Sequence, residues 1–171
     1  LSVFNHLARC RYRTIIISRF ISYLANQDCC IQIQSASDNT GFKKLISHLK
    51  RMDTGLMYLQ VPELQSMATR KDLQGYAARF AIVDKQLELL MSVMTSTDLL
   101  MITSSFANDP ADRQRQVTRE YLPILMYTPG FKIGHSLGTR STAGDVAATI
   151  IDNFREPDDR LPLRNSLLKS M

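Results

Sequence analysis

The stretch DLLMITSSFANDPADRQRQVTREYLPILMY, residues 98–127, decides the fold of this chain. It predicts two strands joined by a long polar loop. Residues 99–103 form an apolar run of the length expected for a buried strand, and residues 122–127 form a second one. The loop between them holds a proline, two aspartates, three arginines and two glutamines, which makes it too polar to be buried. Loops that leave the carboxyl ends of buried strands often build the sites of α/β domains, so we expect functional residues here.

The rest of the chain alternates predicted strands with predicted helices. Further strands are expected at 14–17, 30–33 and 56–61, and helices at 3–9, after Ser18, at 41–51, 73–94 and 142–154, with 62–70 as a loop. Helices of ten or more residues between strands favour a largely parallel sheet. The sequence therefore predicts an α/β fold with a mostly parallel sheet and helices on both faces. The 171 residues predict a single domain, 1–171, with a loosely ordered tail over 155–171.

Composition excludes some classes of function. Hydrophobic content of 44%, charged content of 22% and a net charge of +5 are typical of a globular protein, and the basic residues are scattered along the chain. Nucleic-acid binding requires basic residues gathered on one face, so no nucleic-acid partner is expected. No apolar run approaches the roughly 20 residues of a membrane span, so no membrane partner is expected either. The three cysteines form no CxxC pair, and we expect reduced thiols in the cytoplasm.

The segments ITSSFANDP (102–110) and VTREYLPIL (117–125) resemble the signature of phosphopentomutases, members of the alkaline-phosphatase-like metalloenzyme superfamily. The family pattern is roughly ITADHGNDP followed by DHTREYVP, and the interval from Asp109 to Thr118 matches without a gap. Further blocks agree in the same order: IISRFISYLANQ (16–27), SASDNTGFKKLI (35–46), GLMYLQV (55–61), RKDLQGYAARFAIVDKQL (70–87) and STAGDVAATIIDNF (141–154). The resemblance implies an alkaline-phosphatase-like core with three αβα layers.

The resemblance also implies which residues stand at the metal-binding positions of the family, where carboxylates and imidazoles hold two Mn²⁺ ions. The positions carry Leu64, Thr69, Ser105, Phe106 and Val117 in this chain. Aliphatic and aromatic side chains do not coordinate such cations, and hydroxyl groups are poor substitutes. We therefore expect no metal and no other cofactor to bind this chain through these residues. The family's remaining metal-binding Asp, its phosphorylated Thr and its cap domain would precede Leu1, which makes the chain the expected C-terminal portion of a longer protein.

Two charged segments of the loop have structural and functional interpretations. Asn108, Asp109 and Pro110 are interpreted as a turn, since Asx-Pro is a common turn starter. Arg119 is the candidate substrate-binding residue, because a guanidinium binds phosphate through two hydrogen bonds, while an Arg119–Glu120 pair that closes the loop is the favoured alternative. At the start of the last helix, Thr142 is expected as the N-cap and Asp145 as a charge that complements the helix dipole. No catalytic residue is predicted.

Three functions remain open at this point. The first is a degenerate, inactive phosphopentomutase-like domain, whose family activity is the metal-dependent transfer of phosphate between C1 and C5 of ribose or deoxyribose. The second is an active phosphosugar mutase completed by N-terminal residues or by another chain. The third is a non-catalytic phosphosugar- or nucleotide-binding module that uses Arg113, Arg115 and Arg119. The candidate partners are a phosphosugar, a second copy of the chain, and the N-terminal portion of the same protein.

Overall fold

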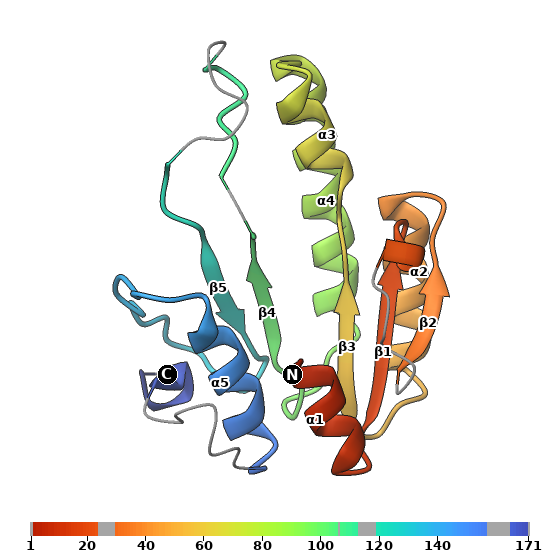
Figure 1. Cartoon of the computed structure of the whole chain (residues 1–171), viewed down its shortest axis with the longest axis vertical. Helices are drawn as coiled ribbons and strands as arrows, with labels where there is room; N and C mark the ends of the chain where they lie inside the picture. The colour runs from red at the N-terminus through yellow and green to blue at the C-terminus, as the bar shows by residue number, and fades with distance from the viewer. Residues whose placement is uncertain (1, 24–29, 106, 113–118, 157–164, 171) are drawn as a thin grey trace.

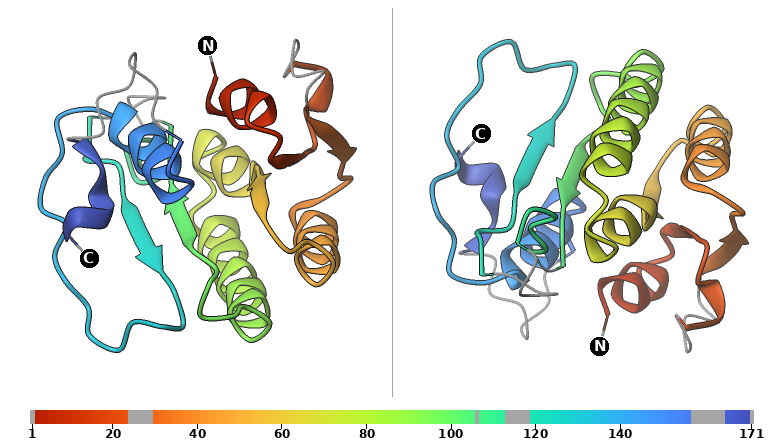
Figure 2. Two further views of the ribbon diagram at one scale, coloured as in Figure 1. Left: turned by 90° about the horizontal axis from the view of Figure 1, so that it is seen from below. Right: turned by 90° about the horizontal axis from the view of Figure 1, so that it is seen from above.

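The computed structural model describes residues 2–23, 30–105, 107–112, 119–156 and 165–170. Figure 1 shows strands running through the middle of the molecule, and the end-on views of Figure 2 show helices on either side of them. Helices α1 (Val3–Arg9) and α5 (Gly144–Asn153) cover one face, and α2 (Asp38–Leu49) and α4 (Leu73–Met91) cover the other. The predicted α/β class with helices on both faces of a sheet is therefore confirmed.

The main sheet has three parallel strands in the order β2-β1-β3. Strand β1 (Arg13–Ser18) lies between β2 (Ile31–Gln34) and β3 (Gly55–Leu59), with Ile16 opposite Gln32 on one side and Tyr58 on the other. The run Thr14–Ser18 is buried throughout, as its β-branched composition predicts for a central parallel strand. All three strands thus end at the same edge of the sheet.

The two strands of the deciding stretch differ from the prediction in their direction. Strands β4 (Leu100–Thr103) and β5 (Ile124–Tyr127) pair antiparallel in a two-stranded sheet of their own. The long polar loop lets the chain reverse, so no crossover helix is needed and the second strand returns beside the first. Leu100 packs against the core cluster that contains Ile15, Ile17 and Leu90, which joins this pair to the rest of the domain.

Helix boundaries match the sequence where a capping residue marks them. Helix α1 begins after Ser2, whose Oγ accepts a hydrogen bond from the amide of Asn5, and α4 begins after Asp72, which accepts from the amide of Gly75. Helix α2 starts at Asp38, three residues earlier than predicted, because Ser37 is its N-cap. After Ser18 the described chain forms only a 3₁₀ turn, η1 (Ile21–Tyr23).

The largest correction to the secondary structure concerns residues 62–70. The sequence predicts a loop there, because Pro62 ends the preceding strand. The structure instead has helix α3 (Glu63–Thr69), which packs on α4. Proline is well tolerated at the first positions of a helix, so Pro62 begins α3 as well as ending the strand segment. The buried Ala68 is the point at which this short helix enters the core.

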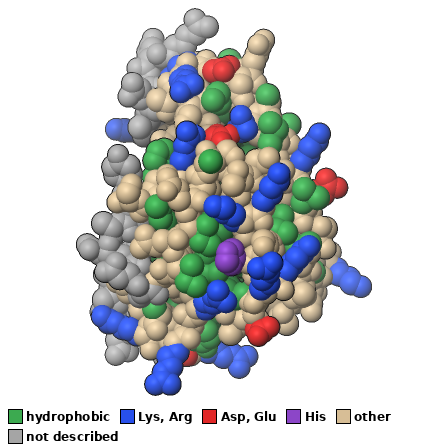
Figure 3. All heavy atoms as spheres, turned by 90° about the vertical axis from the view of Figure 1, so that its right-hand side faces the viewer, with side chains coloured by type: hydrophobic (Ala, Val, Ile, Leu, Met, Phe, Trp, Pro, Cys, Tyr) green, Lys and Arg blue, Asp and Glu red, His purple; other side chains and the backbone are tan. Residues whose placement is uncertain are grey.

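The described part of the tail contains a 3₁₀ helix, η3 (Leu167–Ser170), which contacts α5. It begins with Leu167, whose side chain is 0% exposed. On the outer surface, Figure 3 shows basic side chains spread over the face that lies at the right-hand side of Figure 1, separated by uncharged atoms. None of the described helices is both long enough and apolar enough to cross a membrane.

Candidate functional site

The loop after β4 meets the corner between α3 and α4. The side-chain amide of Asn108 donates a hydrogen bond to Thr69 Oγ1 at 3.2 Å and accepts one from Lys71 Nζ at 3.3 Å. Lys71 Nζ also donates to the backbone carbonyl of Asp109 at 3.1 Å. Residues about 40 positions apart are thereby joined at the carboxyl end of β4, where the sequence places the functional loop.

Lys71 holds an unusual backbone conformation in this corner. Its φ is +58°, in the left-handed region that a residue with a side chain adopts at a cost. The residue lies between the end of α3 and the N-cap Asp72, so the conformation sets the turn from one helix into the next. The long lysine side chain spans from this turn to the loop after β4 and brings a positive charge there.

Three of the five positions matched to metal ligands are described, and none carries a suitable donor. Leu64 and Thr69 lie on α3, and Ser105 lies exposed two residues after β4. Phe106 and Val117 lie outside the described residues. The contact between Thr69 and Asn108 brings the last residue of α3 next to the loop that contains Ser105. Within the described part of the chain, no group of three or more His, Cys, Asp or Glu side chains is placed to hold a metal ion.

A carboxylate does lie next to Leu64, but it has other partners. Glu63 Oε1 accepts a hydrogen bond from the amide of Asp38 at 3.0 Å, and Asp38 Oδ2 accepts one from the amide of Glu63 at 3.1 Å. Each residue thus caps the helix that the other begins. Glu63 Oε2 also forms an ion pair with Arg79 at 2.8 Å. Both carboxylate oxygens of Glu63, the residue before Leu64, are therefore occupied by protein groups.

The pKa of Asp38 follows from this arrangement. Burial, and after it the negative charge of Glu63, raises the pKa of Asp38 from 3.8 to about 6. The hydrogen bond from the amide of Glu63 and the charges of Arg79 and Arg19 act in the opposite direction, but less strongly. Asp38 is consequently a buried acid that titrates near neutral pH at the edge where β1 and β3 end. Sequence analysis missed this pair because its members are 25 residues apart.

The loop residues with predicted roles are only partly described. Asp109 Oδ1 accepts a hydrogen bond from the amide of Ala111 at 2.8 Å, which confirms the predicted turn. Arg119 is exposed and precedes β5, and its predicted contact with a phosphate remains a prediction. Arg113 and Arg115 lie outside the described residues.

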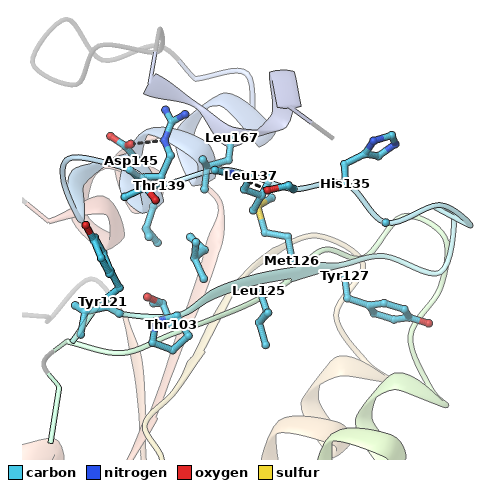
Figure 4. Close-up of a pocket in the computed structure, with 18 of the residues that line it drawn as sticks. Thr103, Tyr121, Leu125, Met126, Tyr127, His135, Leu137, Thr139, Asp145 and Leu167 are labelled. Atoms are coloured by element: carbon cyan, nitrogen blue, oxygen red, sulfur yellow. Dashed lines mark hydrogen bonds and ion pairs between the residues drawn. The ribbon is translucent and has the colours of Figure 1, made fainter.

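A pocket of about 870 Å³ lies beside this region, between β5, the segment 131–142 and the start of α5 (Figure 4). Thr103 and Ser104 at the end of β4 form part of its wall, so it extends to the residue before Ser105. Its volume is within the range of small-molecule sites. His135 also borders the pocket, and in Figure 4 its ring points away from β5.

Asp145 lies in the wall of this pocket and in the first turn of α5, where its charge complements the helix dipole as predicted. The residue is 3% exposed, and its Oδ2 accepts a hydrogen bond from Arg140 Nε at 2.9 Å. Arg140 also donates to the backbone carbonyl of Asn165, which ties the start of α5 to the tail. Helix α5 begins at Gly144 with Ala143 as its N-cap, so the prediction of Thr142 as the N-cap is wrong, although Thr142 Oγ1 accepts a hydrogen bond from the Gly144 amide. Asp145 is thus a buried, paired acid as well as a first-turn charge.

A comparison with protein families gives one match. The sequence profile of the metalloenzyme superfamily matches residues 23–157, which is more than half of the 171 residues. The matched range begins before β2 and ends after α5, so it contains the α3–α4 corner, the loop after β4 and nearly the whole pocket wall.

Proposed function

This chain belongs to the metalloenzyme superfamily, and from that premise we propose that it is a phosphopentomutase-like domain that has lost its metal-binding residues and its catalytic activity. Membership supports a domain of the metal-dependent phosphoryl-transfer type. The finer assignment to phosphopentomutases is supported by the segments ITSSFANDP and TREYLP and by their interval. In that family the activity is transfer of phosphate between C1 and C5 of ribose or deoxyribose.

The observation that carries the proposal is the hydrogen bond between Asn108 and Thr69. It supports the alignment, because two segments matched separately to metal-binding positions meet in space. The matched positions that are described carry a leucine, a threonine and a serine, and the ammonium of Lys71 is hydrogen-bonded to Asn108 at the meeting point. A fixed positive charge repels a cation, and hydroxyl groups do not replace carboxylates and imidazoles as ligands of Mn²⁺. The residues that are described do not fit the metal, so we assign no step to it.

The proposal has two further features, a candidate phosphate-binding residue and a location in the cell. If the domain binds a phosphosugar without reaction, Arg119 is the residue that we assign to its phosphate, because it is exposed in the segment that precedes β5. A cytoplasmic location is part of the proposal, because the three cysteines of the sequence form no CxxC pair.

Titration with Mn²⁺ tests the proposal directly. We expect isothermal titration calorimetry to detect no tight site on the wild-type chain. A single tight site would overturn the loss of metal binding. Turnover of ribose 1-phosphate to ribose 5-phosphate in the presence of Mn²⁺ and a bisphosphate activator would overturn the loss of activity and support the active mutase instead.

A restored variant tests the alignment on which the proposal depends. The changes Leu64→Asp, Thr69→His, Ser105→Asp, Phe106→His and Val117→His put back the residue types of the family. We expect this variant to bind Mn²⁺ more tightly than the wild type. The matched control moves the two α3 changes by one residue, to Gln65→Asp and Arg70→His, which turns them by about 100° around the helix. Equal binding by both variants, or none by the restored one, would contradict the alignment.

A further inference from the structure

Helix α4 leaves most of its apolar side chains in solvent. Of its 19 residues, all of which the structure describes, only Leu90 is buried. Leu73, Phe80 and Leu89 are each more than half exposed, and Ile82 is 40% exposed. A helix that is apolar on most of its sides is usually buried, and monomeric proteins rarely expose large apolar patches. The outer side of α4 therefore has the composition of a surface that packs against a partner.

The strands beside α4 are also partly bare on the same side of the molecule. Helix α4 lies on the side of the strands opposite α5 (Figure 2). In Figure 4, Leu125 and Tyr127 point away from Asp145 of α5 and from the pocket, so they face the side on which α4 lies. Leu125 is 60% exposed, which means that α4 leaves part of this face of β5 uncovered. Exposed apolar residues of a helix and of a strand thus share one side of the chain.

The residues on the outer face of α4 are arranged symmetrically about Ala81. Ala81 is exposed and lies nine residues before the buried Leu90, which is about two and a half turns and therefore on the opposite side of the helix. The four large apolar residues stand in pairs at equal distances from it, Phe80 and Ile82 at one residue, Leu73 and Leu89 at eight. A twofold axis pairs residues at equal distances, so the face is complementary to a second copy of itself.

Small side chains and charges indicate how two such faces would meet. Ala77, Ala78 and Ala81 are all exposed, and small residues let two helix axes approach to about 8 Å. In an antiparallel pair centred on Ala81, the charged residues Asp84, Lys85 and Glu88 of one copy lie opposite Ala78, Ala77 and Gln74 of the other. In a parallel pair each charge would instead lie beside its own counterpart, which is unfavourable. The charges therefore favour the antiparallel arrangement.

The exposed area is enough for a weak dimer. Half of a large apolar side chain amounts to roughly 100 Å², so the four residues of two copies bring roughly 800 Å² to the contact. The exposed alanines and the aliphatic stems of Lys85 and Glu88 add to it. Specific interfaces bury about 1,200–2,000 Å² in total, and weak ones bury less. The expected area lies near the lower limit, so we expect association at micromolar rather than nanomolar concentration.

We propose that α4 packs antiparallel against the α4 of a second copy of this chain, around a twofold axis near Ala81, and that the chain forms a weak homodimer. The inference goes beyond the function proposed above and does not depend on it, because neither Arg119 nor any of the five matched metal positions lies on α4.

Sedimentation velocity of the whole chain between about 1 and 200 μM tests the proposal. We expect a monomer–dimer equilibrium with a dissociation constant between about 1 and 100 μM. Ala81→Arg places two like charges at the axis and should weaken association at least tenfold, while the helix is retained because arginine is a good helix former. The matched control Ser47→Arg, at an exposed position of α2, adds the same charge and should associate as the wild type does.

The double variant Leu73→Gln with Leu89→Gln gives a second test that adds no charge. It removes apolar area at both ends of the face and should also weaken association, so the proposal is tested even if Ala81→Arg does not fold. Wild-type association in either folded variant would overturn the proposal. A chain that stays monomeric at about 200 μM, or a control that weakens association as much as Ala81→Arg does, would overturn it as well.

Discussion

Replacing Asp38 by asparagine should make the protein more stable at neutral pH. Asp38 is 3% exposed and faces Glu63, so its charged form is unfavourable in the folded state. Its pKa is 3.8 in the unfolded reference and about 6 in the fold, which means that the folded protein binds the proton more tightly. The contribution of Asp38 to stability is therefore fully present below pH 3.8 and is lost as the pH rises through about 6.

The size of this effect follows from the displacement of the pKa. At about 1.4 kcal/mol per pH unit, a displacement from 3.8 to about 6 corresponds to at most about 3 kcal/mol. Asparagine carries no charge at any pH, and its carbonyl oxygen can still accept the hydrogen bond from the Glu63 amide, which Asp38 Oδ2 accepts at 3.1 Å. We expect the free energy of unfolding of Asp38→Asn to equal that of the wild type near pH 4 and to be larger by as much as about 3 kcal/mol at pH 7.

Urea unfolding followed by circular dichroism at pH 4, 5, 6 and 7 measures this difference. Subtracting the two free energies of unfolding at each pH cancels the titration of groups that do not interact with Asp38. Asp84→Asn, which removes a charge from an exposed position on α4, is the matched control and should give a difference that does not vary with pH. A difference for Asp38→Asn that is constant from pH 4 to 7, or that falls as the pH rises, would refute the reasoning.

Three further predictions concern the fold. Gly55→Ala should destabilise the protein by roughly 2–4 kcal/mol in urea unfolding, because Gly55 has φ +146° and a Cβ there would collide with the backbone carbonyl of Arg13. A loss of stability below about half a kcal/mol would contradict this prediction. Leu167→Ala should lower the free energy of unfolding by about 2–4 kcal/mol, whereas Leu125→Ala, at an exposed position, should lower it by less than about 0.5 kcal/mol. Equal losses of stability in the two variants would show that the tail does not belong to the core. Lys71→Met should lower the free energy of unfolding by about 1 kcal/mol and should speed hydrogen exchange at residues 69–71 and 107–109. Unchanged exchange would speak against the contact of Lys71 with Asn108.

The sequence by itself determined the elements whose signals are local. Ser2 and Asp72 marked the starts of α1 and α4, and the β-branched run in β1 marked a buried strand, because caps and side-chain preferences act over only a few residues. The resemblance pointed to the right superfamily by the same route, since it depends on short motifs and their order.

Only the tertiary structure decided the features that join distant parts of the chain. The antiparallel return of β5, the pair of Asp38 and Glu63, and the contact of Asn108 with Thr69 depend on partners 21 or more residues away, and helix α3 depends on its packing against α4. The carboxylate oxygen Oδ1 of Asp145, which is buried and has no hydrogen-bond partner among the described residues, belongs to the same group, because its burial arises only when α5, the pocket wall and the tail are packed together. Spacing along a chain reports which face of an element is apolar, whereas the burial and pairing of a charge depend on what packs against that face.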